Sequence, residues 1–86
     1  MIKIDNREIL TAREAKEKYE NYYIGFFTTE WHVNFDFAKG NVVYLFDSEN
    51  EGYQIAREYL ERKEWISVLR GYGVKEVGGV EILWKA

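Results

Sequence analysis

Aromatic side chains crowd one stretch of this chain, between Tyr19 and Phe37. A domain of 86 residues buries only about 60–65% of the surface that its unfolded chain exposes, so its core has room for few large rings. We therefore expect some of these rings to close a dimer, to meet a partner or to line a shallow groove. The rings in this stretch belong to Tyr19, Tyr22, Tyr23, Phe26, Phe27, Trp31, His32, Phe35 and Phe37.

The rest of the composition is that of a small globular domain from a reducing compartment. Hydrophobic residues make up 47% of the chain, charged residues make up 31%, and the net charge is −3. Because there is no cysteine, the chain has no disulfide and no thiol nucleophile. Its longest apolar run, Val42 to Phe46, is far shorter than the ~20 residues that span a bilayer, and no signal-peptide core follows Met1. We expect a single domain over residues 1–86, cytoplasmic and not bound to a membrane.

Two extended segments and a capped helix are predicted at the amino-terminal end. The segment 2–4 alternates in hydropathy and the segment 7–10 is again extended, with turn residues between them, which predicts a β-hairpin. Thr11 and Glu14 have the spacing of a capping box, and the apolar spacing that follows predicts a helix over 12–20.

The remainder of the chain predicts strands, one long loop and a second helix. The segment 22–29 has the aromatic and β-branched content of a strand. The segment 41–46 is apolar on both faces, so we expect it at the centre of a sheet, with helices over at least one face. Ser48 and Glu51 form a second capping box. The predicted elements, in order, are strand 22–29, loop 30–41, strand 41–46, helix 49–63, strand 65–69 and strand 80–84.

This order of elements predicts an α+β fold. Strand, helix, strand, strand, helix, strand (βαββαβ) is the ferredoxin-like order, in which two helices pack on one face of a mainly antiparallel sheet. The strand predicted at 80–84 would be an extra C-terminal strand at an edge of that sheet. The alternative is an α+β meander with the same elements in a different strand order.

No segment has the spacing of a catalytic or metal site. His32 is the only histidine, the residue that most often serves as a general base. A general base needs a nucleophile and an orienting carboxylate within reach, and the residues around His32 show no recognisable spacing of that kind. Structural zinc takes about four ligands, mainly Cys and His, and the chain has no cysteine. We expect no catalytic residue, no metal and no cofactor, and a protein that is not an enzyme.

The charge balance bears on the kind of partner. Asp and Glu number 15 against 12 Lys and Arg, and no basic stripe lies among the rings. Because nucleic-acid affinity comes largely from Lys and Arg against phosphate, this balance argues against nucleic acid. We expect a small non-enzymatic protein-interaction or regulatory module, such as an inhibitor or adaptor, that contacts a protein partner or a second copy of itself. The candidate contact residues are Trp31, His32, Phe35, Phe37 and Tyr72.

Two other functions are compatible with the same residues. A pocket between the loop 30–41 and the sheet, holding His32, would make a small-ligand-binding or enzymatic domain. An open sheet face that carries rings would stack the bases of a single-stranded nucleic acid. The sequence leaves open the identity of the partner, the oligomeric state and the division of the rings between core and surface.

Overall fold

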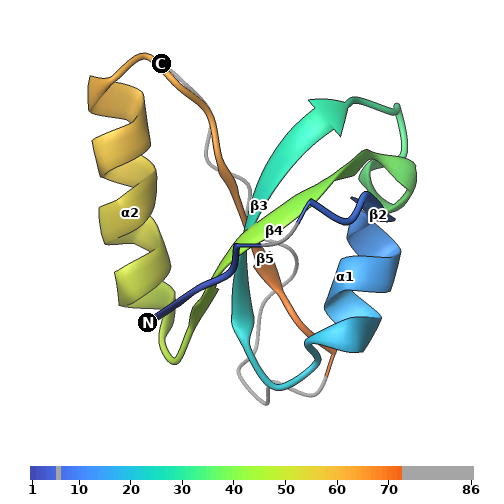
Figure 1. The fold of residues 1–86 in the computed structure, drawn as a ribbon, viewed down its shortest axis with the longest axis horizontal. Helices are drawn as coiled ribbons and strands as arrows, with labels where there is room; N and C mark the ends of the chain where they lie inside the picture. Colours follow the sequence, from blue (N-terminus) through green and yellow to red (C-terminus); the bar gives the residue numbers. More distant parts are fainter. Residues whose placement is uncertain (6, 73–86) are drawn as a thin grey trace.

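A computed structural model describes residues 1–5 and 7–72, and the strand predicted over 80–84 lies outside these residues. The fold is α+β, with a mainly antiparallel sheet of five strands and two α-helices (Figure 1). The two predicted helices and the three predicted strands between residues 22 and 69 are confirmed, with boundaries that shift by a few residues. In chain order, the elements are β1 (Ile2–Lys3), β2 (Leu10–Thr11), α1 (Ala12–Lys18), β3 (Tyr23–Glu30), the 3-10 helix η1 (Phe35–Phe37), β4 (Lys39–Phe46), α2 (Glu49–Glu61) and β5 (Ser67–Arg70).

β3 and β4 form the central hairpin of the sheet. They pair antiparallel from Tyr23 opposite Phe46 to Glu30 opposite Lys39. β5 pairs with the other edge of β3, along Tyr23–Phe26. The strand order across the sheet is therefore β1-β4-β3-β5, with β2 also paired to β4.

The predicted hairpin between residues 2 and 10 is wrong. β1 and β2 both pair antiparallel with β4, where Ile2 lies opposite Leu45 and Leu10 lies opposite Gly40. β4 has 8 residues, whereas β1 and β2 have 2 each, so a single edge of β4 accommodates both. An isolated two-stranded hairpin is only marginally stable in water. Pairing with a long central strand therefore stabilises these two short segments more than pairing with each other would.

The strand order differs from the ferredoxin-like order, and this difference moves one helix. β2, α1 and β3 form a crossover around β4, and β4, α2 and β5 form a second crossover around β3. The second crossover starts on β4, which runs antiparallel to β2, the strand on which the first crossover starts. Both crossovers move across the sheet in the same direction, toward the edge that β5 forms. Since such crossovers are right-handed, the two helices are then required to lie on opposite faces. Figure 1 shows α1 and α2 on either side of the strands, so the prediction of two helices on one face is wrong.

The face of the sheet under α1 carries one hydrophobic core. Ile24 and Phe26 of β3 point to this face and are fully buried. α1 packs on them through Ala12 and Ala15, whose small side chains let the short helix lie close to the strands. The remaining buried members of this core are Leu10, Val42, Leu45 and Leu69.

The face under α2 has its own core, and two glycines allow close packing there. A Cβ atom on Gly25 would lie 3.0 Å from the Tyr44 Cβ and 3.2 Å from the Phe46 Cε2. A Cβ atom on Gly52 of α2 would lie 2.8 Å from the Val68 Cγ1. Glycine inside a helix costs about 1 kcal/mol relative to alanine, and here it lets α2 approach the sheet. Ala56, Ile66 and Val68 are the buried residues of this core.

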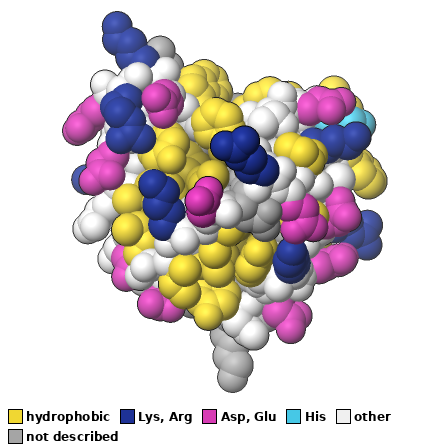
Figure 2. All heavy atoms as spheres, in the orientation of Figure 1, with side chains coloured by type: hydrophobic (Ala, Val, Ile, Leu, Met, Phe, Trp, Pro, Cys, Tyr) yellow, Lys and Arg dark blue, Asp and Glu magenta, His cyan; other side chains and the backbone are white. Residues whose placement is uncertain are grey.

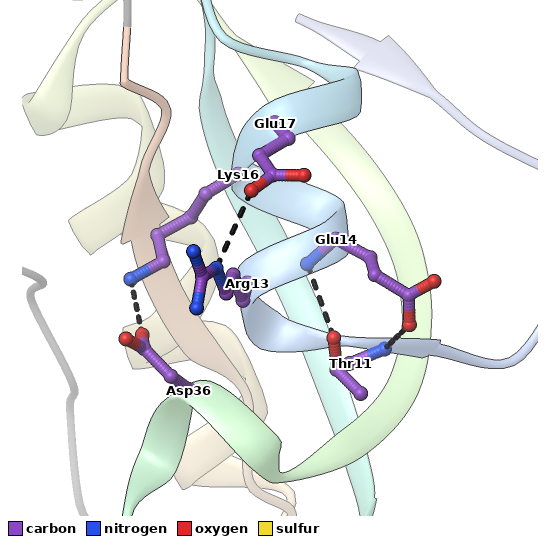
Figure 3. Close-up of polar contacts among 6 residues, drawn as sticks. All are labelled: Thr11, Arg13, Glu14, Lys16, Glu17 and Asp36. Atoms are coloured by element: carbon purple, nitrogen blue, oxygen red, sulfur yellow. Dashed lines mark hydrogen bonds and ion pairs between the residues drawn. The ribbon is translucent and has the colours of Figure 1, made fainter.

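The predicted capping box at Thr11 is confirmed, whereas the one predicted at Ser48 is present only as an N-cap, because the Glu51 carboxylate accepts from the Asp47 N–H at 3.4 Å. The Thr11 Oγ1 accepts a hydrogen bond from the Glu14 N–H at 3.1 Å, and the Glu14 Oε1 accepts one from the Thr11 N–H at 3.0 Å (Figure 3). The hydrogen bond that the Glu14 carboxylate accepts from the Thr11 backbone N–H, followed by the interaction with the Thr11 side chain, holds the pKa of Glu14 below its ordinary value. At the start of α2, the Ser48 Oγ accepts from the Glu51 N–H at 3.4 Å. Each cap satisfies backbone groups that the first turn of a helix leaves unpaired.

Candidate binding groove

β3 extends beyond β5, so no other strand of the described residues lies beside the last part of this edge. The pairing of β3 with β5 ends at Phe26 and Ser67, whereas β3 continues to Glu30. Among the described residues, no backbone hydrogen bond joins Phe27–Glu30 to the chain that leads into β5. Figure 1 shows this chain diverging from the tip of β3. Within residues 1–5 and 7–72, the N–H and C=O groups that point to this side of Phe27–Glu30 thus have no partner strand.

A groove of about 400 Å³ lies along this open edge. Its most prominent side chains are Trp31, directly after β3, and Trp65, shortly before β5. The two indole rings meet edge to face with 6.2 Å between their centroids, and they remain 46% and 40% exposed. The groove is therefore apolar, open to solvent and within the size range of small binding pockets. Its lining residues are Phe27, Thr28, Trp31, Glu64, Trp65, Ile66 and Ser67.

Thr28, one of the lining residues, carries a buried polar atom, its Oγ1, without a hydrogen-bond partner among the described residues. Buried polar atoms are normally paired, and leaving one unpaired costs about 1–3 kcal/mol. The next residue behaves differently, because the Thr29 Oγ1 donates to the Lys39 carbonyl at 3.3 Å. Because the Oγ1 has almost no exposed surface, a group that enters the groove would reach it only after the Thr28 side chain rotates.

The loop between β3 and β4 holds Trp31 in place. The Phe35 ring lies 5.7 Å from the Trp31 ring and 6.4 Å from the Phe26 ring, measured between centroids. Phe35 therefore connects the groove to the core beneath α1. The local turn is set by Asn34, whose side-chain oxygen accepts from the Asp36 N–H at 3.1 Å at the start of η1.

An ion pair joins η1 to α1. The Lys16 Nζ donates to the Asp36 Oδ1 at 2.6 Å, and Figure 3 shows the two side chains pointing toward each other. The Lys16 side chain is only 4% exposed, whereas that of Asp36 is 40% exposed. Because a buried ammonium group needs its counter-charge, this pair fixes η1 and, through Phe35, the position of Trp31.

His32 and Phe37 contact each other in the same loop. The His32 Nδ1 accepts from the Asn34 N–H at 3.0 Å, and its ring meets the Phe37 ring edge to face at 5.5 Å between centroids. Both side chains are exposed, and neither lines the groove. In the structure, the His32 side chain stabilises the turn through this hydrogen bond. A contact function of His32 and Phe37 stays a prediction.

Tyr72 follows β5 and lies beside α1. Its ring lies over the Lys16 ammonium group, with Nζ 5.2 Å from the ring centroid, and its N–H donates to the Lys16 carbonyl at 3.4 Å. Tyr72 does not line the groove. Of the predicted contact residues, the structure thus brings Trp31 and Phe35 together at the groove and places Tyr72 in a different contact.

Sequence reasoning missed Phe27, Thr28 and Trp65 as parts of a site. Trp31 and Trp65 are far apart in the chain and meet because β5 is placed next to β3. No local pattern encodes that placement. The signal that was available is that each tryptophan adjoins the end of a predicted strand, where a ring has fewer neighbours to bury it.

Hydrophobic side chains also gather elsewhere on the surface. Figure 2 shows them in a band across the middle of one face, with Lys, Arg, Asp and Glu side chains around and within it.

None of the helices in the described residues has the length and apolar character needed to cross a membrane. Within residues 1–5 and 7–72, no cluster of His, Cys, Asp or Glu is arranged to hold a metal ion. No protein-family model matches the chain, and comparisons with curated proteins and with solved structures find none that is similar.

Proposed function

We propose that this protein is a non-enzymatic protein-interaction module whose contact surface is the groove beside Trp31 and Trp65. The observation that carries the proposal is the pair of half-exposed indole rings beside a strand edge that no other described strand covers. Tryptophan is enriched among the few residues that dominate interface energies, because its large ring loses much water-exposed area when a partner covers it. Trp31 and Trp65 keep 46% and 40% of their surface exposed, and a partner that covers this part would be favoured.

The charges near the groove favour a protein partner over a nucleic acid. Glu64 lines the groove, and Glu30 ends the strand whose edge forms it. Both side chains are exposed, and the net charge of the chain is −3. A phosphate backbone would be repelled by these carboxylates, whereas a protein segment carrying Lys or Arg would be attracted.

A site that depends on His32 is supported less well. The His32 Nδ1 is already engaged by the Asn34 N–H, and its ring packs against Phe37 rather than facing the groove. A small-ligand or enzymatic function at His32 therefore stays an alternative that His32→Ala tests directly.

Site-specific photo-crosslinking tests the proposed function. A photoreactive phenylalanine analogue is placed at Phe27, in the groove, and for comparison at Ile9, which is 54% exposed and precedes the strand β2 on the other side of β4. We expect adducts with a protein partner from position 27 and not from position 9. The partner is then purified, and its affinity for substituted chains is measured by calorimetry.

The substituted chains distinguish the candidate functions. Trp31→Ala should weaken the purified complex about 30-fold, as expected for loss of a central tryptophan. Ile9→Ala and His32→Ala should each leave the affinity within about twofold. Equal adducts from both positions, or a Trp31→Ala chain that binds as well as the wild type, would contradict the proposal. A function lost in His32→Ala and kept in Trp31→Ala would support the ligand-site alternative instead.

A further inference from the structure

We propose that the groove binds an extended segment of the partner, which adds as a strand to the free edge of β3 and places a bulky apolar side chain beside Trp31 and Trp65. This inference rests on the proposed function and specifies the form of the partner. In strand addition, main-chain hydrogen bonds supply affinity and pockets for alternate side chains supply specificity. The described residues provide both parts, namely the open edge of Phe27–Glu30 and the apolar groove beside it.

Thr28 supplies an independent reason to expect a polar ligand at this edge. An apolar groove alone would accept any hydrophobic side chain. The buried Thr28 Oγ1, however, lacks a hydrogen-bond partner among the described residues. A peptide main chain carries an N–H or C=O group at every residue, so a strand laid along Phe27–Glu30 brings such groups to the groove. The same ligand would pair with the strand edge and, after rotation of the Thr28 side chain, with its hydroxyl.

The length and charge of the edge favour a peptide over a second copy of the chain. At ~3.3 Å per residue, Phe27–Glu30 spans about 13 Å. Stable protein interfaces bury at least about 1,200 Å², which so short a strand pairing does not reach by itself. A twofold dimer across this edge would also bring the Glu30 and Glu64 side chains of both copies into the same region. A partner segment with Lys or Arg next to its apolar residue meets those carboxylates with opposite charge.

Selection from a random library of short peptides displayed on phage tests the chemistry of the ligand. The full-length chain is the bait, and binders that also attach to Trp31→Ala are removed. We expect enrichment of sequences that combine Trp, Phe, Leu or Ile with a nearby Lys or Arg. Synthetic versions should bind Trp31→Ala at least about tenfold more weakly than the wild type. No enrichment, or enrichment of acidic sequences, would overturn the proposal.

N-methylation of the selected peptide tests strand pairing itself. Backbone amides alternate in direction along a strand, so methyl groups on every second amide remove the donors that face β3. Methylation in that register should weaken binding at least about tenfold, and methylation of the intervening amides should change it less than about twofold. Equal effects of the two registers would overturn strand addition.

Two threonine variants provide a matched comparison. Thr28→Val removes a hydroxyl without a partner, so the free protein should melt at the same or a higher temperature while peptide affinity falls about fivefold. Thr29→Val removes the hydroxyl that donates to Lys39, so the melting temperature should fall while peptide affinity stays within about twofold. An unchanged peptide affinity in Thr28→Val would overturn the assignment of Thr28 to the ligand.

Amide hydrogen exchange in the full-length chain distinguishes the other occupants. Without peptide, the amides of Phe27–Glu30 that face the open edge should exchange much faster than those of Tyr23–Phe26 that face β5, and peptide should slow them. Protection at every protein concentration would mean that the chain covers its own edge, and protection that grows with concentration would mean a second copy. Either result overturns the peptide.

The proposed function can survive failure of strand addition, and the experiments separate the two. If Trp31→Ala weakens the purified partner complex but both N-methylation registers bind equally, strand addition fails and the interaction module stands. If Trp31→Ala affects neither the partner nor the peptide, both proposals fail.

Discussion

Removing Asp36 should destabilise the protein far more than removing Lys16, although the two residues form one ion pair. The Lys16 side chain is 4% exposed and that of Asp36 is 40% exposed, with 2.6 Å between Nζ and Oδ1. In Asp36→Ala, the ammonium group stays buried and loses its counter-charge. In Lys16→Met, the buried position receives an apolar side chain of similar length, and the Asp36 carboxylate turns to water. Removing one partner of a buried pair is costly, whereas replacing its buried charge by an apolar group is often neutral.

The expected magnitudes follow from this asymmetry. A hydrogen bond to a charged group contributes about 1.5–3 kcal/mol, and solvent at Asp36 screens part of it, so we expect a loss of roughly 2 kcal/mol for Asp36→Ala. Lys16→Met should lose less than about 1 kcal/mol. The double variant should resemble Lys16→Met, because the unpaired ammonium group is then absent. Urea unfolding followed by tryptophan fluorescence measures these values; with a slope near 1 kcal/mol per M, the Asp36→Ala midpoint should fall by roughly 2 M.

An exposed ion pair on the same helix provides the control. The Arg13 Nε and the Glu17 Oε1 are 3.4 Å apart, and both side chains are more than half exposed. Glu17→Ala should therefore lose less than about 0.5 kcal/mol. An Asp36→Ala chain that unfolds at the midpoint of Glu17→Ala would show that the ion pair of Lys16 contributes no more than an exposed one. A Lys16→Met chain that loses as much stability as Asp36→Ala would show that the buried charge is not the source of the cost.

Three other perturbations test separate parts of the fold. Gly40→Ala would place a Cβ atom 2.1 Å from the Phe27 carbonyl oxygen, so it should lose about 3 kcal/mol in urea unfolding, and a wild-type midpoint would show that β4 shifts freely. Thr11→Ala removes the cap of α1 and should lose about 1 kcal/mol, with less helical circular dichroism. Burial, followed by the hydrogen bond with Tyr44, raises the pKa of Tyr59 to about 12 from 10.0. Because the neutral phenol is favoured in the folded state, its contribution to stability is full below pH 10 and is lost as pH rises through about 12; an ultraviolet titration in which every tyrosine ionises near 10 would contradict this.

The parts of the fold that the sequence predicted are those encoded within a few neighbouring residues. The capping box at Thr11 and the N-cap at Ser48 mark the starts of the two helices, because each cap and the N–H that it satisfies are three positions apart. The apolar content of β4 marks a central strand, and both faces of the sheet are covered. The ferredoxin-like order and the helix positions were mispredicted because they depend on which edge of the sheet β5 joins. That choice is made by packing between distant residues, such as Gly25 with Ile66.

The groove arises from a mismatch in strand length that the fold does not require. β3 has 8 residues and β5 has 4; Trp31 directly follows β3, and Trp65 lies shortly before β5. Natural sheets usually protect such an edge with charges, proline or a covering segment. Here the described residues place exposed indole rings beside the edge and leave the Thr28 hydroxyl unpaired, and each feature lowers the stability of the free domain. The entry of one extended segment with an apolar side chain would relieve both costs. We therefore attribute the exposed tryptophans and the unpaired Thr28 hydroxyl to ligand binding in the groove, and not to a surplus of aromatic residues over the space in the core.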